Sequence, residues 1–334
     1  MIGGLLAAAG ALGLGGWYAH ERGLRRTHAM SGGLHAEITL PHTAEFELYH
    51  NDFSLCSKKI RMCLAELGIP YLGHPIDLIE TGSYETLSRR FLAVNPAGLV
   101  PVLVHEGHPI YESHEILLYA AAHSGAPDAL VPADPAQRAL MQRWIDRSSL
   151  TGDDPTADLA SSAGNCVPGL TVPLFAAMIR EIGTPRIVEG LLFHRLKQRP
   201  LLFLALKTVG LSRIGALAPV RGAVVASRRQ LERHLDELER QLAASGGPWI
   251  VGRDFTLADV SWAVIFERLR EAAFSAELLG ARPGLAAYWE RLRARPSYDA
   301  AMTRHQHPLV RLGTERIAAE KASNEAFRAA LYAA

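Results

Sequence analysis

The sequence has few cysteines and almost no net charge. Its three cysteines, Cys56, Cys63 and Cys166, cannot form a complete disulfide framework because their number is odd. Such sparse cysteine usage is typical of a reducing compartment. A formal charge of +1 lacks the basic excess typical of nucleic-acid-binding chains, so no nucleic-acid partner is expected. A length of 334 residues with 49% hydrophobic residues is sufficient for two compact domains.

Charged side chains are absent from residues 1–18. This apolar run is near the lower length limit for a membrane span, and no Lys or Arg precedes it, which argues against a cleavable signal peptide. Arginines follow it from Arg22 onward and would hold the remaining chain on the cytoplasmic side. We therefore expect residues 1–19 to form a single-pass anchor in the inner membrane, with the other domains cytoplasmic. The alternative is a start at Met30, which would give a cytoplasmic protein.

Strand and helix patterns alternate in the first part of the chain. Strands are predicted at residues 46–50, 71–78, 100–104 and 109–111, and helices at residues 54–68 and 113–123. A parallel strand pair followed by a hairpin is typical of a thioredoxin-like α/β unit. We assign this domain to residues 45–126, after a polar and irregular linker at residues 20–44.

No strand pattern is present beyond Ala133, and residues 134–310 are predicted to form an all-helical domain. Its helices are marked by capping sequences and apolar stripes. They are expected to begin at Asp134-Pro135, Ser227, Thr256-Leu257-Ala258-Asp259 and Pro283. Residues 311–334 are predicted to form a peripheral tail helix, and His305-Gln306-His307 a solvated loop.

An inserted segment at residues 153–225 has two interpretations. Apolar runs alternate there with basic residues, Pro200 breaks any continuous helix, and Cys166 lies in a predicted loop. One interpretation is a pair of core-packing helices. The other is a basic amphipathic surface at residues 191–220 that contacts a membrane together with residues 1–19.

A cysteine-containing sequence stands where the first predicted strand turns into a helix. A helix N-terminus offers free backbone N–H groups and partial positive charge, which favour an anion or a thiolate. Ser54 and Cys56 are placed there, and Lys58, Lys59 and Arg61 add positive charge one turn on. A protein thiolate or a bound thiolate ligand is what such a place would stabilise. The alternatives are that Cys56 is a small buried hydrophobe and that Ser54 is only an N-cap.

Three motifs in this part of the chain occur together in one known family. They are Ser54-Leu55-Cys56-Ser57-Lys58-Lys59-Ile60-Arg61, Asn95-Pro96-Ala97-Gly98-Leu99-Val100-Pro101-Val102-Leu103 and Glu112-Ser113. From about Phe46 to about Met302 the chain resembles the glutathione transferase superfamily. The first motif is similar to Ser-x-Cys-Ser-x-(Arg/Lys)-x-Arg of zeta-class isomerases and tetrachlorohydroquinone reductive dehalogenases. The long inserted segment further resembles the dehalogenase branch and the ganglioside-induced differentiation-associated proteins.

The resemblance implies a thioredoxin-like α/β domain followed by an all-α domain, which is the glutathione transferase fold, here preceded by an apolar N-terminal helix. It also implies glutathione as co-substrate and no metal. Ser54 would donate a hydrogen bond to the glutathione sulfur, and Cys56 would form a mixed disulfide with glutathione. Zeta-class isomerases usually have serine where this chain has Leu55, which favours thiol exchange over isomerisation.

The other two motifs would bind glutathione. The resemblance implies a cis peptide before Pro101, which would present the backbone of Val100 to the cysteinyl part of glutathione. Glu112 and Ser113 would meet the γ-glutamyl group, whose carboxylate suits the start of a helix.

The predicted function is a glutathione-dependent transferase or thiol-exchange enzyme. It would act on a small hydrophobic electrophile by conjugation or by reductive dehalogenation. The alternative is a membrane-tethered binding or scaffold protein on the same fold with little or no catalysis. The resemblance also implies a homodimer.

Overall fold

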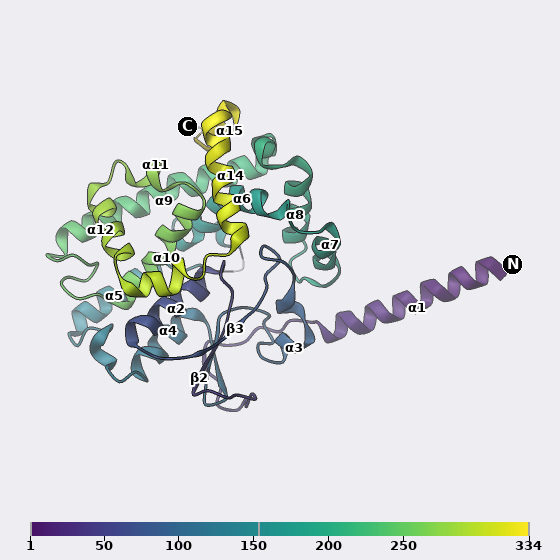
Figure 1. Ribbon diagram of the computed structural model, residues 1–334, viewed down its shortest axis with the longest axis horizontal. Coiled ribbons are helices and arrows are strands. Elements are labelled where there is room, and N and C mark those ends of the chain that lie inside the picture. The colour runs from purple at the N-terminus through teal and green to yellow at the C-terminus, as the bar shows by residue number, and fades with distance from the viewer. Residues whose placement is uncertain (1, 153, 333–334) are drawn as a thin grey trace.

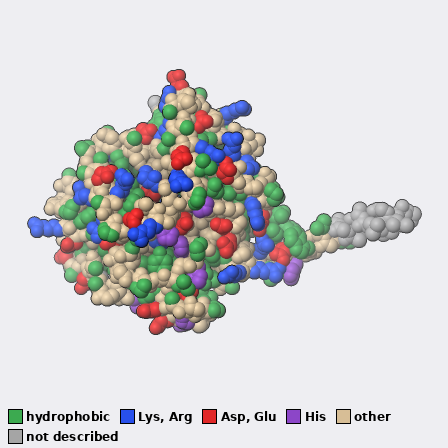
Figure 2. Space-filling model, in the orientation of Figure 1, with side chains coloured by type: hydrophobic (Ala, Val, Ile, Leu, Met, Phe, Trp, Pro, Cys, Tyr) green, Lys and Arg blue, Asp and Glu red, His purple; other side chains and the backbone are tan. Residues whose placement is uncertain are grey.

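The computed structural model describes residues 2–152 and 154–332, without the side chains of residues 2–11, 127 and 155. A sheet with its helices forms the lower part of the body in Figure 1, and a larger helical unit packs on it. Acidic and basic side chains are interspersed over the face that Figure 2 shows, in keeping with the small net charge.

Strands in the described residues form one mixed sheet. They are β1 (Gly33–Leu34), β2 (Phe46–His50), β3 (Leu72–Pro75), β4 (Val102–His105) and β5 (His108–Tyr111). Their order is β1-β5-β4-β2-β3, with β2 parallel to β3 and the other neighbours antiparallel. The parallel pair and the β4–β5 hairpin confirm the predicted thioredoxin-like unit. Strand β1 was not predicted: it comes from the expected linker and extends the sheet beside β5.

Helix α2 (Leu55–Leu67) connects the parallel strands and is capped at both ends. The Ser54 hydroxyl oxygen accepts a hydrogen bond from the Ser57 backbone N–H at 3.2 Å, and Gly68 ends the helix with a φ of 65°. On its predicted apolar side, Ile60, Cys63 and Leu64 are buried and Leu67 is partly buried. The cap therefore fixes Ser54 and the first turn of α2 at the carboxyl end of β2. The other helices of this unit are α3 (Arg89–Leu92) and α4 (Ser113–Ala122).

The helical unit is arranged around α10 (Leu257–Glu271), which is buried along nearly its whole length. The predicted capping box starts it: the Thr256 backbone N–H donates to the Asp259 carboxylate at 2.8 Å. The remaining helices are α5 (Pro135–Arg147), α6 (Ala163–Ile179), α7 (Thr184–Phe193), α8 (Gln198–Val209), α9 (Ala218–Ala244), α11 (Ser275–Leu279), α12 (Pro283–Arg293), α13 (Pro296–Tyr298), α14 (Pro308–Ser323) and α15 (Glu325–Tyr332).

The inserted segment differs from its prediction. Residues 153–225 contain α6, α7, α8 and the start of α9, and α6 is a core helix rather than an insertion. Cys166 is a buried residue of α6, not a loop residue. Two features hid this helix: Pro168 and Pro173 lie inside it, and it is apolar on every side, so no 3.6-residue period is visible. Of the two interpretations, core packing holds, since α8 buries Phe203 and Leu206.

The C-terminal tail also differs from the single peripheral helix predicted for residues 311–334. It forms most of α14 and a second helix, α15, with residues 333–334 outside the described part. Both helices bury apolar side chains against the helical unit, including Ile317 and Phe327. The tail is therefore part of the core, because its apolar residues are spaced to face α6 and α9.

Helix α1 (Ile2–Leu24) leaves the body to one side in Figure 1. In the described part of the chain, no helix is long and apolar enough to cross a membrane. The single-pass anchor predicted at residues 1–19 is therefore not supported. Residue 1 and the side chains of residues 2–11, which belong to that prediction, lie outside the described part.

The C-terminal end of α1 packs against α7. The Tyr18 hydroxyl donates to the Leu192 carbonyl oxygen at 3.3 Å, and the Arg25 guanidinium lies 2.8 Å from the Glu189 carboxylate. Residues 20–44 are thus not a plain linker, since they include the end of α1 and strand β1. The local sequence did not predict these elements because they are held by contacts with residues far away in the chain.

Candidate active site

A cavity of about 500 Å³ opens at the first turn of α2. Three of the predicted site residues line it together: Ser54 at the start of α2, Val100 before β4 and Glu112 before α4. Three further walls were not predicted. Residues 27–30 of the N-terminal segment form one, with the His28 backbone N–H donating to the Pro96 carbonyl oxygen at 2.8 Å. The segment after β3, from Leu78 to Leu87, forms the second, and the loop between α7 and α8 forms the third.

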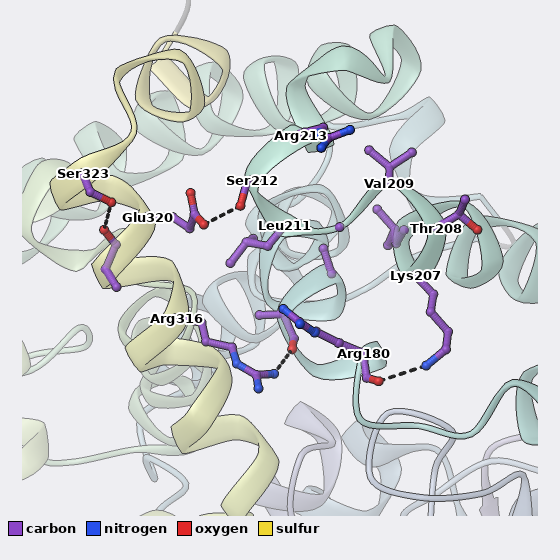
Figure 3. Close-up of a pocket in the computed structure, with 15 residues that line it drawn as sticks. Arg180, Lys207, Thr208, Val209, Leu211, Ser212, Arg213, Arg316, Glu320 and Ser323 are labelled. Carbon is purple, nitrogen blue, oxygen red and sulfur yellow. Dashed lines mark hydrogen bonds between the residues drawn. The ribbon is translucent and has the colours of Figure 1, made fainter.

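A second cavity, of about 630 Å³, lies between α6, α8 and α14 (Figure 3). It contains none of the predicted site residues. Two of its basic side chains donate hydrogen bonds to carbonyl oxygens at the C-terminal end of α6. Lys207 donates to the Arg180 carbonyl oxygen at 2.9 Å, and Arg316 donates to the Ala177 carbonyl oxygen at 2.9 Å. These are helix C-terminal contacts, so we place the candidate active site at the first cavity.

The Ser54 side chain is partly exposed at the cavity. Its oxygen accepts the Ser57 N–H, which occupies one lone pair and leaves the hydroxyl proton able to donate into the cavity. The cap role and the predicted sulfur-binding role are therefore compatible at this position.

Asn51, which was not predicted as a site residue, holds the turn that carries Ser54. Its side-chain oxygen accepts the backbone N–H groups of Phe53 at 2.8 Å and Ser54 at 3.1 Å. Its amide donates to the Ile76 carbonyl oxygen at 2.8 Å and to the Thr81 hydroxyl at 2.9 Å. One buried side chain thus connects the β2–α2 turn to the segment after β3. An Asn directly after a strand is a turn signal that was available in the sequence.

Replacement of Asn51 by Ala is expected to lower the free energy of unfolding by about 2–4 kcal/mol, because it leaves several buried backbone groups without partners. Urea unfolding followed by circular dichroism would measure this. Thr81→Val is the matched control, since it removes one of the four contacts and should cost less. Equal stability of Asn51→Ala and the wild type would contradict the role of Asn51.

The loop before β4 presents Val100 to the cavity. The Val100–Pro101 peptide bond is cis, as the resemblance implied. Asn95 holds the loop, since its amide donates to the Leu99 carbonyl oxygen at 2.8 Å. Gly98 has a φ of 67°, and a Cβ there would lie 3.1 Å from the Thr27 side chain. The N-terminal segment therefore packs closely on this loop.

Glu112 and Ser113 stand where β5 turns into α4. Glu112 has a φ of 65°, in the left-handed region that non-glycine residues rarely adopt. Such backbone outliers cluster at functional sites, where the surrounding structure holds them. Ser113 is buried as the first residue of α4, and its helix start provides free N–H groups at the cavity edge.

Cys56 is the second residue of α2 and is partly exposed. It is not among the residues that line the cavity with Ser54. The other two cysteines are buried, and burial raises the pKa of the Cys166 thiol to about 12 and that of Cys63 well above its usual range. Of the three thiols, Cys56 is the one that solvent and ligands reach.

The three cations of the first motif look alike in the sequence but have different surroundings in the structure. Lys58 forms a buried ion pair with Glu271 of α10. Arg61 donates to the Ala301 carbonyl oxygen at 3.0 Å and to His50 at 3.1 Å. Both side chains therefore connect α2 to the helical unit and do not interact with the Cys56 thiol. Lys59 alone remains on the Cys56 side of the helix.

A group of possible metal ligands lies near Arg61. His50, Asp52 and His305 have ligand atoms within 4.8 Å of one another. The Arg61 guanidinium is 3.8 Å from the Asp52 carboxylate, and a cation there opposes metal binding. His305 Nδ1 lies 3.0 Å from Asp52, so we interpret the group as a contact between the two units. Residues 305–307 form a partly exposed loop, as predicted, and its His307 side chain caps α14.

Two family descriptions match the chain. "Glutathione S-transferase, N-terminal domain" matches residues 53–123, which contain all six predicted site residues. "Glutathione S-transferase, C-terminal domain" matches residues 216–291.

Curated relatives align over most of the chain. A 2,5-dichlorohydroquinone reductive dechlorinase from Sphingobium indicum is 30% identical over 79% of this chain and 84% of its own length. A tetrachloro-p-hydroquinone reductive dehalogenase from Sphingobium chlorophenolicum is 27% identical over 77% of this chain and 95% of its own. The glutathione S-transferase TCHQD of Arabidopsis thaliana is 28% identical over 78% and 90%.

Solved structures share the fold. The beta-etherase LigF from Sphingobium sp. strain SYK-6 superposes with a TM-score of 0.60 and 23% identity, over 78% of this chain and all of that one. Glutathione transferase F7 from Populus trichocarpa gives a TM-score of 0.53 with 20% identity, over 78% and 99%. Both likenesses support a thioredoxin-like domain joined to a helical domain.

Proposed function

We propose a reaction for this site on the premise that the chain belongs to the glutathione S-transferase family. It is a glutathione transferase-like enzyme, glutathione is its co-substrate, and its activity is of the transferase or reductive dehalogenation type. We propose a small halogenated aromatic as the electrophile, because two relatives are named for chlorinated hydroquinones. The main observation that supports this site is that Ser54, Val100 and Glu112 line one cavity.

Glutathione is proposed to lie along these three residues. Its sulfur would meet the Ser54 hydroxyl, which would stabilise the thiolate by donating a hydrogen bond to it. Its cysteinyl backbone would pair with Val100 beside Pro101. Its γ-glutamyl carboxylate would meet Ser113 and the N–H groups at the start of α4, with Glu112 facing the ammonium group.

Cys56 is proposed to carry the reductive part of the reaction. Glutathione thiolate first displaces halide from carbon, and the halide leaves with its bonding electron pair. Cys56 thiolate then attacks the sulfur of this conjugate: a sulfur–sulfur bond forms, the carbon–sulfur bond breaks, and the carbon keeps the electron pair and takes a proton. A second glutathione thiolate attacks the mixed disulfide, which yields glutathione disulfide and restores Cys56.

Replacement of Ser54 by Ala tests the glutathione site. We expect kcat/KM for conjugation of a generic electrophile to fall about 10²-fold, since one hydrogen bond to the reacting anion is lost. Steady-state kinetics at saturating glutathione would measure it. Ser54→Thr keeps a hydroxyl and should retain more activity than Ser54→Ala. Unchanged kcat/KM in the Ala variant would remove Ser54 from the proposed mechanism.

A further inference from the structure

The peptide bond that leads into Ser54 is held at both of its ends. Its N–H, which belongs to Ser54, donates to the Asn51 side-chain oxygen at 3.1 Å. Its carbonyl oxygen, which belongs to Phe53, accepts a hydrogen bond from the Arg268 guanidinium of α10. A peptide unit is planar, so contacts at both ends fix its orientation and the position of the Ser54 Cα atom. One of these contacts comes from the α/β unit and the other from the helical unit.

Arg268 also contacts the Phe53 side chain. The central carbon of its guanidinium lies 3.7 Å from the centroid of the Phe53 ring, and both side chains are buried. A cation over an aromatic face is attracted to it, and more strongly where water is excluded. Arg268 thus binds both the backbone and the ring of the residue directly before Ser54.

The charge of Arg268 is matched within its surroundings. Its guanidinium lies 2.9 Å from the Glu271 carboxylate, one turn on in α10. Burial lowers the pKa of this guanidinium, and the carboxylates of Glu271, Glu80 and Glu267 oppose the lowering. The guanidinium stays protonated and keeps its N–H donors, since arginine is not deprotonated in proteins. It is therefore a permanent donor to the Phe53 carbonyl oxygen.

The stability of the fold alone does not account for an arginine at this position. Taking a charge out of water is costly, and apolar side chains of similar volume often stabilise a buried site as well as an ion pair does. Its neighbours on α10, Phe266 and Leu269, are apolar and fully buried. An apolar residue in place of Arg268 could fill the same space, but it could not donate to the Phe53 carbonyl oxygen.

We propose that Arg268 is a positioning residue of the active site, which holds the peptide bond between Phe53 and Ser54 so that the Ser54 hydroxyl faces the cavity. This inference rests on the proposed function, in which that hydroxyl donates to the glutathione sulfur. Because Arg268 belongs to the helical unit, the site is complete only when this unit is packed against the start of α2.

Two measurements on the full chain test this role. Hydrogen–deuterium exchange of peptides that cover residues 51–58 reports the turn itself. The ultraviolet absorbance of the thiolate of bound glutathione, followed against pH, reports the environment of its sulfur. In Arg268→Met we expect the turn amides to exchange about tenfold faster. We also expect the thiolate midpoint to rise by about one pH unit, because the Ser54 hydroxyl is no longer held in place.

Arg268→Lys is the second variant, and it repeats the test if Arg268→Met does not fold. It keeps a positive charge beside Glu271, but an ammonium lacks the planar fork that reaches a carboxylate and a carbonyl oxygen together. Both measurements should change in the same direction as in Arg268→Met and by less.

Arg270→Met is the matched control on the same helix. The Arg270 guanidinium lies 2.7 Å from the buried Glu267 carboxylate, and in the described part of the chain its side-chain hydrogen bonds go to Glu267. Its loss also breaks an ion pair of α10, so it should lower stability. It should leave the turn exchange and the thiolate midpoint unchanged, because Arg270 does not hold the β2–α2 turn.

The double variant of Arg268→Met and Ser54→Ala separates this inference from the proposed function. If Arg268 acts through Ser54, the double variant should have the thiolate midpoint of Ser54→Ala alone. Additive shifts would overturn the inference. So would wild-type turn exchange in Arg268→Met, or a wild-type midpoint in Arg268→Met when Ser54→Ala shifts it. Faster turn exchange in Arg268→Met, with a wild-type midpoint in Ser54→Ala, would support the hold on the turn and reject the proposed role of Ser54 instead.

Discussion

Replacement of Glu271 by Gln is expected to lower the free energy of unfolding by about 3–5 kcal/mol, because it breaks a buried ion pair and leaves cations uncompensated. Glu271 is 1% exposed. It lies between the Lys58 ammonium of α2 and the Arg268 guanidinium of α10, both buried. Gln has the same shape but no charge, so the loss reports electrostatics rather than packing. The pair joins α2 to the helical unit, so the first turn of α2 should loosen as well.

Urea unfolding, followed by circular dichroism and by tryptophan fluorescence, would measure this change. Glu290→Gln is the control, since its partner Arg293 is exposed, and exposed pairs contribute under about 1 kcal/mol. Adding Lys58→Met to Glu271→Gln should recover part of the loss, because it removes one uncompensated cation. A stability of Glu271→Gln within about 0.5 kcal/mol of the wild type would show that the pair is not needed.

Local signals predicted much of the fold. The caps at Ser54, Asp134 and Thr256 start helices where the sequence placed them, with the Asp134 carboxylate accepting the Gln137 N–H at 2.8 Å. The β4–β5 hairpin likewise follows from its turn residues. These features depend on neighbours within a few residues, so a sequence pattern is sufficient to find them.

Features that depend on distant contacts were not predictable in this way. Strand β1 forms because β5 offers an open edge, and α6 is recognised as a helix only by the partners that bury it on every side. The same limit applied to the cations of α2. Lys58 and Lys59 are adjacent and look equivalent in the sequence, yet one meets Glu271 and the other His114.

The sequence predicted individual site residues, and the structure shows which of them lie together and what surrounds them. Ser54, Val100 and Glu112 were predicted from motifs of the family that the chain resembles, and they line one cavity. Asn51 was missed because its contacts reach residues 25 and 30 positions away, Ile76 and Thr81. The walls at residues 27–30, at residues 78–87 and between α7 and α8 were missed because they belong to segments without a motif. The expected homodimer stays a prediction.

Replacement of Cys56 by Ser is expected to remove the reductive step, with a loss of about 10³-fold or more in release of the dehalogenated product. A serine hydroxyl cannot form a disulfide, so attack on the glutathionyl sulfur has no nucleophile. The first step, which uses glutathione thiolate, does not involve Cys56. The glutathionyl conjugate of a chlorinated hydroquinone should therefore accumulate in this variant.

Chromatography of the products, with intact mass of the enzyme after exposure to glutathione disulfide, would measure both consequences. The wild type should gain one glutathionyl group at Cys56, and Cys56→Ser should gain none. Cys63→Ala is the matched control on the same helix, because Cys63 is fully buried among core side chains and should leave adduct and product unchanged. Ser54→Ala should affect the other step of the mechanism. It should slow conjugation, while the glutathionyl adduct at Cys56 still forms. Dehalogenated product from Cys56→Ser at the wild-type rate would show that a second glutathione attacks the conjugate directly, and that Cys56 has no part in the chemistry.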